Sequence, residues 1–204
     1  MAGYGPLVAP RLPANERRDQ LLTVAVDVFA RKGFHGTSMD DVAKAAGVTK
    51  PVVYQHFASK RRLYLELLSD VGNRLLLAIG AATAGAPSPR AQVERGFAAY
   101  FQWVADDHDS FTLLFGSGAR RDREFAEAVR RVERTIADAI TPLIAADIDD
   151  DHRALLAAAL VGLAEATSRR LVGAGHSFDV VRVSRQLADL AYAGLRGVHR
   201  VPGG

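Results

Sequence analysis

The sequence contains no cysteine, which excludes a disulfide framework, a thiolate metal site and a cysteine nucleophile. Its six histidines are scattered and show none of the His-x-x-x-His or His-Glu-x-x-His spacings that place two metal ligands on one helix face. Long apolar runs are also absent. The longest stretch without a polar side chain is Ala154–Ala164, far short of the roughly twenty residues that span a bilayer. We therefore expect neither a bound metal nor a membrane-spanning helix.

Signals for catalysis are equally sparse. Gly116-Ser117-Gly118 is not the Gly-x-Ser-x-Gly turn of a serine hydrolase. Gly173-Ala174-Gly175 follows a predicted helix, whereas a dinucleotide-binding loop follows a strand. The acidic run at residues 149–151 is typical of a solvated loop that caps the next helix, although a cation site is the alternative. We expect a protein that is not an enzyme and needs no cofactor.

What the sequence does have is an uneven distribution of charge. The chain of 204 residues carries a net charge of +3. Residues 1–62 contain ten Lys and Arg against five Asp and Glu, whereas residues 63–204 contain sixteen against eighteen. An excess of cations is expected where a protein neutralises phosphates, so the first part is suited to nucleic acid and the remainder to a different partner. The first residues lack the cationic start and apolar run of a secretory signal, and we expect a cytoplasmic protein.

Residues 37–60, TSMDDVAKAAGVTKPVVYQHFASK, predict two short helices joined by a turn. Ser38 and Asp41 have the spacing of a capping box, which starts a helix at the next residue. Gly47 supplies the left-handed residue that ends this helix, and Thr49 is placed to cap the second one. Helix, short turn and helix is the pattern that places a recognition helix in the DNA major groove.

The outward face of the second helix carries hydrogen-bonding side chains and an excess of positive charge. Residues 49–62 contain four cations and no carboxylate, whereas a solvated helix more often shows mixed charge. Helical hairpins also occur in proteins that bind no DNA, which is the alternative interpretation of the spacing. The predicted DNA-binding residues are Ser38, Thr49, Lys50, Val52, Tyr54, Gln55, His56 and Lys60. Lys50 and Gln55 are suited to base edges and Val52 to a thymine methyl group, and the others to phosphates.

This stretch resembles the DNA-binding domain of the tetracycline-repressor (TetR) family. The resemblance covers roughly residues 15–68. It rests on four strings: Thr37-Ser38-Met39-Asp40-Asp41-Val42-Ala43, Ala46-Gly47-Val48-Thr49-Lys50, Val53-Tyr54-Gln55-His56-Phe57 and Ser59-Lys60. The resemblance implies an all-α dimeric transcriptional regulator with an N-terminal three-helix helix-turn-helix domain and a C-terminal helical domain for ligand binding and dimerisation. Beyond Leu68 the likeness is only architectural.

Three regions are predicted: a tail over residues 1–14, the helix-turn-helix domain over 15–62 and a helical domain over 63–204. The tail is rich in Gly and Pro and has no periodicity. Hydrophobic spacing predicts one helix over Asn15–Lys32 and a long one over residues 59–84. The later helices are predicted at Arg90–Asp106, Ser110–Phe115, Asp122–Ala146, Asp151–Val172 and Asp179–Val198, and Pro142 should kink or end the third of these.

Aromatic side chains are concentrated in the C-terminal domain, where six of the fifteen lie between residues 97 and 115. The simplest interpretation is a hydrophobic core. The functional alternative is an apolar ligand pocket between helices, oriented by a few polar groups. The candidate pocket residues are Phe97, Tyr100, Phe101, Trp103, His108, Phe111, Phe115, Arg120 and Glu165. In the TetR family, which this chain resembles, the effector pocket lies in this domain and its residues follow no sequence motif. The sequence therefore does not identify the ligand.

The run Ala154–Ala164 predicts a helix that is apolar all round and must be buried on both sides. One side can meet the protein's own core, and the other needs a partner. The final helix is expected to lie beside it. The resemblance implies that these two helices form a four-helix interface in a homodimer, for which the candidate residues are Ala158, Gly162, Leu187, Leu190, Ala191 and Leu195.

The sequence thus favours a one-component transcriptional regulator. We expect a repressor that binds a pseudo-palindromic operator as a dimer and is released by a small-molecule ligand. One alternative is an activator of the same family, because the sign depends on where the operator lies. The other is a ligand-binding or interaction module that keeps the fold without using DNA.

Overall fold

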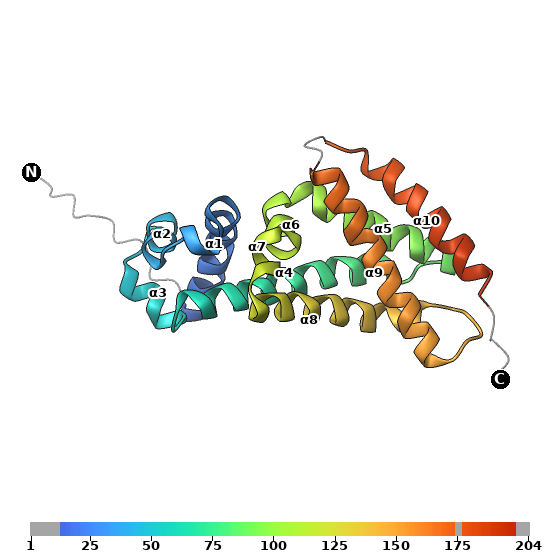
Figure 1. Ribbon diagram of the computed structural model, residues 1–204, viewed down its shortest axis with the longest axis horizontal. Coiled ribbons are helices and arrows are strands. Elements are labelled where there is room, and N and C mark those ends of the chain that lie inside the picture. Colours follow the sequence, from blue (N-terminus) through green and yellow to red (C-terminus); the bar gives the residue numbers. More distant parts are fainter. Residues whose placement is uncertain (1–12, 174–176, 199–204) are drawn as a thin grey trace, which may run out of the picture. The chain divides into compact units, whose positions relative to one another are not determined.

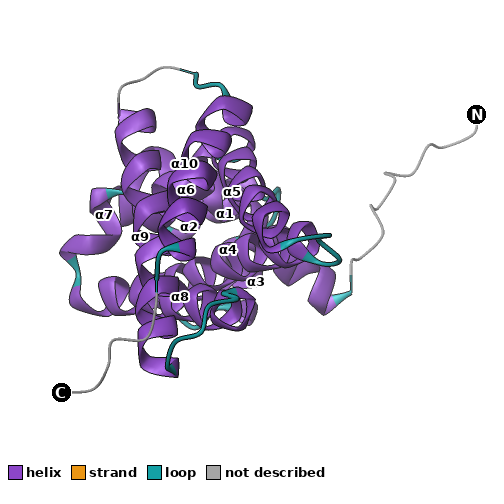
Figure 2. Cartoon of the chain, turned by 90° about the vertical axis from the view of Figure 1, so that its right-hand side faces the viewer, coloured by secondary structure: helices purple, strands orange, loops and turns teal. Residues whose placement is uncertain are grey.

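The computed structural model describes residues 13–173 and 177–198, and in these ranges every regular element is a helix (Figure 2). The all-α class expected from the sequence is confirmed. The elements in order are α1 (Ala14–Gly36), α2 (Met39–Ala45), α3 (Lys50–His56), α4 (Lys60–Thr83), α5 (Pro89–Asp106), α6 (His108–Phe115), α7 (Ser117–Arg121), α8 (Arg123–Ile140), the 3-10 turn η1 (Thr141–Leu143), α9 (Asp150–Gly173) and α10 (Val180–Arg196). Within the described residues, no helix combines the length and apolar character needed to cross a bilayer. The predicted tail over residues 1–14 lies almost wholly outside the described residues.

The helices fall into two compact units, divided between Leu63 and Tyr64. The first unit contains α1, α2, α3 and the first residues of α4, which surround a small core (Figure 1). Side chains that are almost completely buried make up this core: Leu21, Leu22, Phe29, Val42, Val53 and Phe57. Because α3 contributes only Val53 from within its length, the rest of this helix is free to face outward.

Two glycines set the course of the chain in this unit. Gly33 has φ 69° and breaks the helical geometry inside α1, and Gly47 has φ 66° after α2. Both values lie in the left-handed region, which side chains with a Cβ rarely adopt. The helix end expected at Gly33 is therefore seen as a sharp bend within α1, after which three more residues are helical.

The second unit contains the remainder of α4 and all later helices. There α5 packs along α10, α8 packs along α9, and α5 also contacts α9 (Figure 1). The contact between α4 and α8 is close at Gly72, where a Cβ would lie 2.5 Å from Cγ1 of Val132. Since two carbon atoms need about 3.5–4 Å, only glycine fits at this position.

Two expectations about the second unit need correction. The predicted helices leave residues 116–121 outside any helix, but Ser117–Arg121 forms the short helix α7. The final helix was expected beside α9, but α10 lies mainly along α5. The expected effect of Pro142 is confirmed, because α8 ends at Ile140 and Pro142 lies in η1. Proline lacks the N–H that a continuing helix would need.

Candidate nucleic-acid interface and ligand cavity

The outward face of α3 is built from side chains that leave the core free. Val53 is fully buried, whereas Lys50, Tyr54 and Gln55 are exposed and Val52 is half-buried. Tyr54 keeps 46% of its surface accessible, which is high for an aromatic residue. The helix has no acidic residue in its first turn and a histidine in its last. A helix with this face can present a cation, an amide and a phenol to a nucleic acid.

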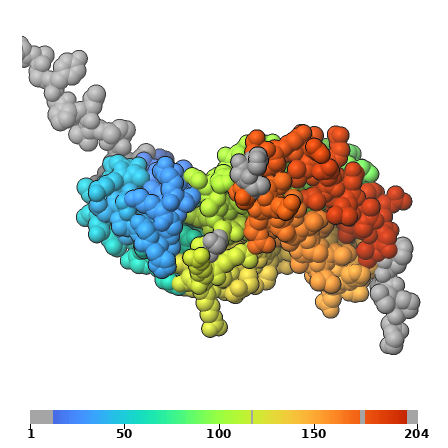
Figure 3. All heavy atoms as spheres, turned by 45° about the horizontal axis from the view of Figure 1, so that its top comes forward, coloured from blue at the N-terminus to red at the C-terminus, as the bar shows by residue number. Residues whose placement is uncertain are grey.

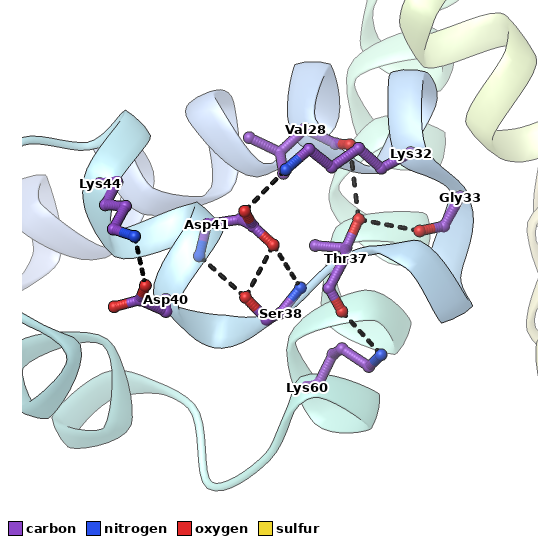
Figure 4. A network of polar contacts seen from close by, with 9 residues as sticks. All are labelled: Val28, Lys32, Gly33, Thr37, Ser38, Asp40, Asp41, Lys44 and Lys60. Atoms are coloured by element: carbon purple, nitrogen blue, oxygen red, sulfur yellow. Dashed lines mark hydrogen bonds and ion pairs between the residues drawn. The ribbon is translucent and has the colours of Figure 1, made fainter.

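A network of polar contacts fixes α2, which precedes this helix (Figure 4). The capping box predicted at Ser38 and Asp41 is present. The Asp41 amide donates to Ser38 Oγ at 3.1 Å, and the Ser38 amide donates to Asp41 Oδ2 at 2.8 Å. Asp41 also accepts a bond from Lys32 Nζ of α1 at 2.6 Å. The Lys32 ammonium and then the Ser38 hydroxyl hold the pKa of the Asp41 carboxyl well below its usual range. The network therefore ties α2 to α1 through an ionised carboxylate.

Lys60, at the start of α4, is held within the same unit. Its ammonium donates to the main-chain oxygen atoms of Phe34 and Thr37 at 2.8 and 2.7 Å and lies 4.5 Å from the centre of the Phe34 ring. The Thr37 hydroxyl in turn donates to the Gly33 carbonyl at 2.8 Å. The bend at Gly33 exposes these carbonyl groups, and the cation satisfies two of them. Lys60 thus joins α4 to the α1–α2 connection.

Three of the predicted DNA-binding residues differ in their contacts within the protein. The Ser38 hydroxyl also donates to Asp41 Oδ2 at 2.7 Å, so both of its donors are used inside the protein. The Lys60 ammonium is likewise engaged with carbonyl groups. Thr49 occupies the N-cap position of α3, but its side chain makes no capping hydrogen bond, contrary to expectation. Lys50, Val52, Tyr54, Gln55 and His56 all lie on α3, as the sequence predicted.

The second unit contains a cavity of about 210 Å³. Its wall is largely apolar and is contributed by α4, α5, α6, α8, η1, α9 and α10. Along α5 the lining runs from Pro89 to Tyr100, which corresponds to roughly 16 Å at 1.5 Å per residue. Arg153 stabilises the loop beside the cavity by donating hydrogen bonds to the carbonyl groups of Ile144 and Ile148. The cavity is long and slender.

The nine candidate pocket residues divide into three groups. Phe97, Tyr100, Phe115 and Glu165 line the cavity. Phe101 and Phe111 are buried beyond its wall, in line with the core interpretation. The remaining three do not line the cavity. Trp103 is half-buried, His108 is exposed, and Arg120 forms an ion pair with Glu165, which does line it.

The sequence reasoning missed most of the aliphatic wall, which includes Ile79, Val93, Ile136, Ile140 and Val161. Helical spacing, such as that of Ile136 and Ile140 on α8, marks the inner face of a helix. Helical spacing does not distinguish side chains that fill a core from side chains that line a cavity. That distinction depends on how all seven elements pack together.

The inner end of the cavity contains a charged cluster. The Glu165 carboxylate, of which 9% is accessible, pairs with Arg120 of α7 and, at 3.0 Å, with Arg169 of α9. Arg120 also lies 3.6 Å from Glu133 of α8. Burial and the neighbouring Glu165 raise the pKa of Glu133. Two cations and two carboxylates therefore balance each other beside the cavity.

The outer face of α9 is apolar and uncovered in the protomer. Ala154, Leu155, Ala158, Ala159 and Gly162 are exposed, with 67% of Leu155 accessible. The outer surfaces of α9 and α10 are seen together on one face of the second unit (Figure 3).

The six candidate interface residues differ in exposure. Ala158, Gly162 and Leu190 are exposed, and Leu187 and Leu195 are half-buried. Ala191, by contrast, is buried within its own protomer. The expectation for Ala191 is corrected, because α10 turns this side of the helix toward α5.

Comparison with known proteins decides the family. Two protein-family sequence models match the chain. The family of bacterial regulatory proteins, tetR family, matches residues 21–67, and the tetracyclin repressor-like C-terminal domain matches residues 89–194. The HTH-type transcriptional activator FasR of Mycolicibacterium smegmatis is 32% identical over 190 residues, which cover 92% of this chain and 87% of FasR. The chain belongs to the TetR family of transcriptional regulators.

Other TetR-family relatives agree with this assignment. The repressor KstR2 of M. smegmatis is 33% identical over 112 residues, covering 55% of this chain and 54% of that protein. The crystal structure of a TetR-like regulator from Rhodococcus sp. RHA1 matches with a TM-score of 0.73 and 30% identity over 92% of this chain and all of that one. FadR from Bacillus subtilis, solved in complex with stearoyl-CoA, shares the fold with a TM-score of 0.75 at 17% identity, over 89% of this chain and 99% of that one.

The chain is therefore a DNA-binding transcriptional regulator and not an enzyme, as the sequence predicted. The named relatives include both an activator and a repressor, so family membership leaves the sign of regulation open.

Proposed function

We propose that the protein acts as a homodimer that binds a pseudo-palindromic operator with α3 of each protomer in the major groove. The observation that carries this proposal is the outward face of α3, which is cationic, free of carboxylates and backed by a polar network that fixes the preceding helix. A two-fold dimer places its two recognition helices about one or more DNA turns apart, roughly 34–36 Å, and thus requires a symmetric site.

Within α3, Lys50 and Gln55 read base edges, and Val52 contacts a thymine methyl group. Tyr54, His56 and the hydroxyl of Thr49 contact phosphates and set the register. Lys60 and Ser38 support this surface from within the protein, because two donors of the Lys60 ammonium and both donors of Ser38 bind other residues of the first unit.

The exposed apolar face of α9 is the dimer interface, together with the outward part of α10. Leu155 and Leu190 keep 67% and 61% of their surface accessible in the protomer. The small residues Ala158 and Gly162 allow a partner helix to approach closely. An apolar surface of this kind is stabilised by burial, at about 25 cal/mol for each Å² removed from water.

The cavity of the second unit binds a slender, mostly apolar effector. A volume of about 210 Å³ lies below the range of drug-sized pockets, roughly 300–1,000 Å³, and a length of roughly 16 Å suits a linear molecule. An acyl chain fits this description, and a structural neighbour was solved with stearoyl-CoA. The effector binds best to the conformation that does not match the operator, so that it releases DNA by a shift in population.

A repressor is our first proposal, and an activator is the alternative within the family. Because the target is chromosomal DNA, the protein acts in the cytoplasm. A ligand-binding module that does not use DNA is a further alternative, but the intact outward face of α3 argues against it.

Selection of bound fragments from sheared genomic DNA tests the operator proposal. We expect wild type to recover a pseudo-palindrome and Lys50→Gln to lose it. Arg31→Gln removes the same charge from α1, where Arg31 pairs with Asp27, and should recover the same fragments as wild type. Equal recovery by wild type and Lys50→Gln would contradict the assignment of α3 and favour the module that does not use DNA.

Sedimentation equilibrium tests the dimer. Leu155→Lys should dissociate the dimer, because it places a charge on the outer face of α9. Leu77→Lys on α4 is the matched control, since Leu77 is also exposed, at 71%. A Leu155→Lys variant as dimeric as wild type would exclude this face as the interface.

A further inference from the structure

Two buried hydroxyl groups, those of Tyr100 and Ser168, lie at or beside the inner end of the cavity. Tyr100 is 6% accessible and lines the cavity, and Ser168, one turn beyond Glu165 on α9, is fully buried. Neither Tyr100 Oη nor Ser168 Oγ has a hydrogen-bond partner of ordinary geometry among the described residues. Pairing the two with each other would still leave one O–H without an acceptor. An unsatisfied buried donor costs about 1–3 kcal/mol, so a ligand group that accepts a hydrogen bond would be favoured at this end of the cavity.

The charges around these hydroxyl groups determine which chemical group can complete the site. Burial raises the pKa of Tyr100, and the nearby Ser168 hydroxyl lowers it by less, so the phenol stays protonated and can donate. Glu165 lines the cavity as well and can accept a hydrogen bond. Its charge is already balanced by Arg120 and Arg169. A ligand group that is itself charged would lose its hydration here without gaining an unpaired counter-ion.

The opposite end of the cavity differs in character. There the wall is formed by Pro89, Gln92, Tyr192 and Arg196. Arg196 is exposed, and no ion pair to it is found among residues 13–173 and 177–198. Arg90 at the same end is paired with Glu94 and Asp189. A free cation at an open end favours an anionic or strongly polar group, which can remain hydrated there.

We propose that the cavity recognises a linear ligand with a polar or anionic outer end and a neutral hydroxyl group at its buried end, bound between Tyr100 and Glu165. The ligand hydroxyl accepts a bond from Tyr100 and donates one to Glu165, so that both the ligand and the protein are satisfied. This inference rests on the proposed binding of an apolar effector in the cavity and adds the chemistry by which its buried end is selected. A plain hydrocarbon end would leave one of the two hydroxyl donors, of Tyr100 or Ser168, without an acceptor.

Isothermal titration of the full-length protein with three matched probes tests the proposal. The probes are dodecanoic acid, 12-hydroxydodecanoic acid and dodecanedioic acid, which differ only at the end remote from the first carboxylate. Wild type should bind the hydroxy acid about five- to thirtyfold more tightly than dodecanoic acid. The diacid should bind more weakly than the hydroxy acid, because its second carboxylate must be buried beside Glu165.

Two conservative variants locate the effect. Tyr100→Phe keeps the ring and removes the donor, and it should reduce the preference for the hydroxy acid to within about twofold. Tyr192→Phe makes the same change at the outer end of the cavity and should keep the preference of wild type. A preference in Tyr100→Phe equal to that of wild type would overturn the assignment of Tyr100.

The remaining outcomes also decide the question. Tighter binding of dodecanoic acid than of the hydroxy acid would overturn the hydroxyl subsite, and so would the absence of binding by all three probes. Neither result affects the operator proposal, because the recovery of genomic fragments is measured without ligand. Loss of operator binding with the probe preference intact would instead refute the DNA-binding proposal and leave the subsite standing.

Discussion

Lys60 ends the helix-turn-helix motif and begins α4. Replacing it distinguishes a structural role of this lysine from a direct contact with DNA. Lys60→Met keeps most of the aliphatic stem and removes the ammonium. The variant loses two hydrogen bonds, to the carbonyl groups of Phe34 and Thr37, and the contact with the Phe34 ring. Both carbonyl groups then lack the charged donor that joins α4 to the α1–α2 connection.

The expected loss of stability follows from these contacts. Hydrogen bonds to a charged group contribute about 1.5–3 kcal/mol each, and a cation–π contact at a partly exposed site contributes about 0.5–1 kcal/mol. Lys60 is only half-buried, and water can replace part of what is lost. We therefore expect the first unit to lose about 2–4 kcal/mol, below the sum of the upper values.

Hydrogen exchange over residues 37–57 is the assay, because it reports local opening of α2 and α3. A loss of 2–4 kcal/mol corresponds to a decrease in protection of about thirtyfold to a thousandfold. Lys50→Met is the matched control. Lys50 is exposed on α3, so this variant should keep the protection of wild type within about twofold while its operator affinity falls.

The salt dependence of operator binding completes the test. A lysine that contacts a phosphate contributes about one to the slope of log affinity against log salt concentration. Lys60→Met should bind more weakly with an unchanged slope, because it removes support and not a phosphate contact. Wild-type hydrogen exchange combined with a slope reduced by about one would refute our reasoning and restore Lys60 to the phosphate-binding set.

Three further predictions concern the fold. The pKa of Asp41 is lowered from its ordinary value of 3.8 on folding. Its contribution to stability is therefore present above about pH 4 and is lost as the pH falls further. Asp41→Asn should remove this part of the acid sensitivity of α2, measured by hydrogen exchange. Gly47→Ala places a Cβ at φ 66° and should destabilise the α2–α3 turn by about 1–2 kcal/mol in the same assay, whereas a neutral effect would show that the turn relaxes. Gly72→Ala should lower the stability of the second unit by about 1–3 kcal/mol in urea unfolding, because its Cβ would overlap Val132.

The first unit was largely predictable because its decisive features are local in sequence. The capping box of Ser38 and Asp41 and the left-handed Gly47 depend on neighbours within a few positions, and both are present. The role of Lys60 was not predictable in this way. Its partners lie 23 and 26 residues earlier in the chain, and no spacing rule connects them.

In the second unit the positions of the helices were predictable, but the residues that form the ligand cavity were much less so. Helix periodicity located α5, α9 and α10 to within about two residues, because a buried face recurs every turn. It did not show that α10 lies along α5, since one apolar stripe fits many partners equally well. The short helix α7 was missed because Gly-Ser-Gly has a low helix propensity.

Glu165 shows why a polar residue in an apolar helix was still a useful signal. A carboxylate between Ala164 and Ala166 cannot remain buried alone, because its desolvation would cost several kcal/mol. The chain therefore had to provide cations, and it does so with Arg169 one turn away and Arg120 from α7. Packing alone does not require three charged residues from two helices, since apolar side chains would fill the same space at lower cost. The same cluster lies next to the buried hydroxyl groups of Tyr100 and Ser168, and the two features together indicate that the inner end of the cavity is built to bind a polar group.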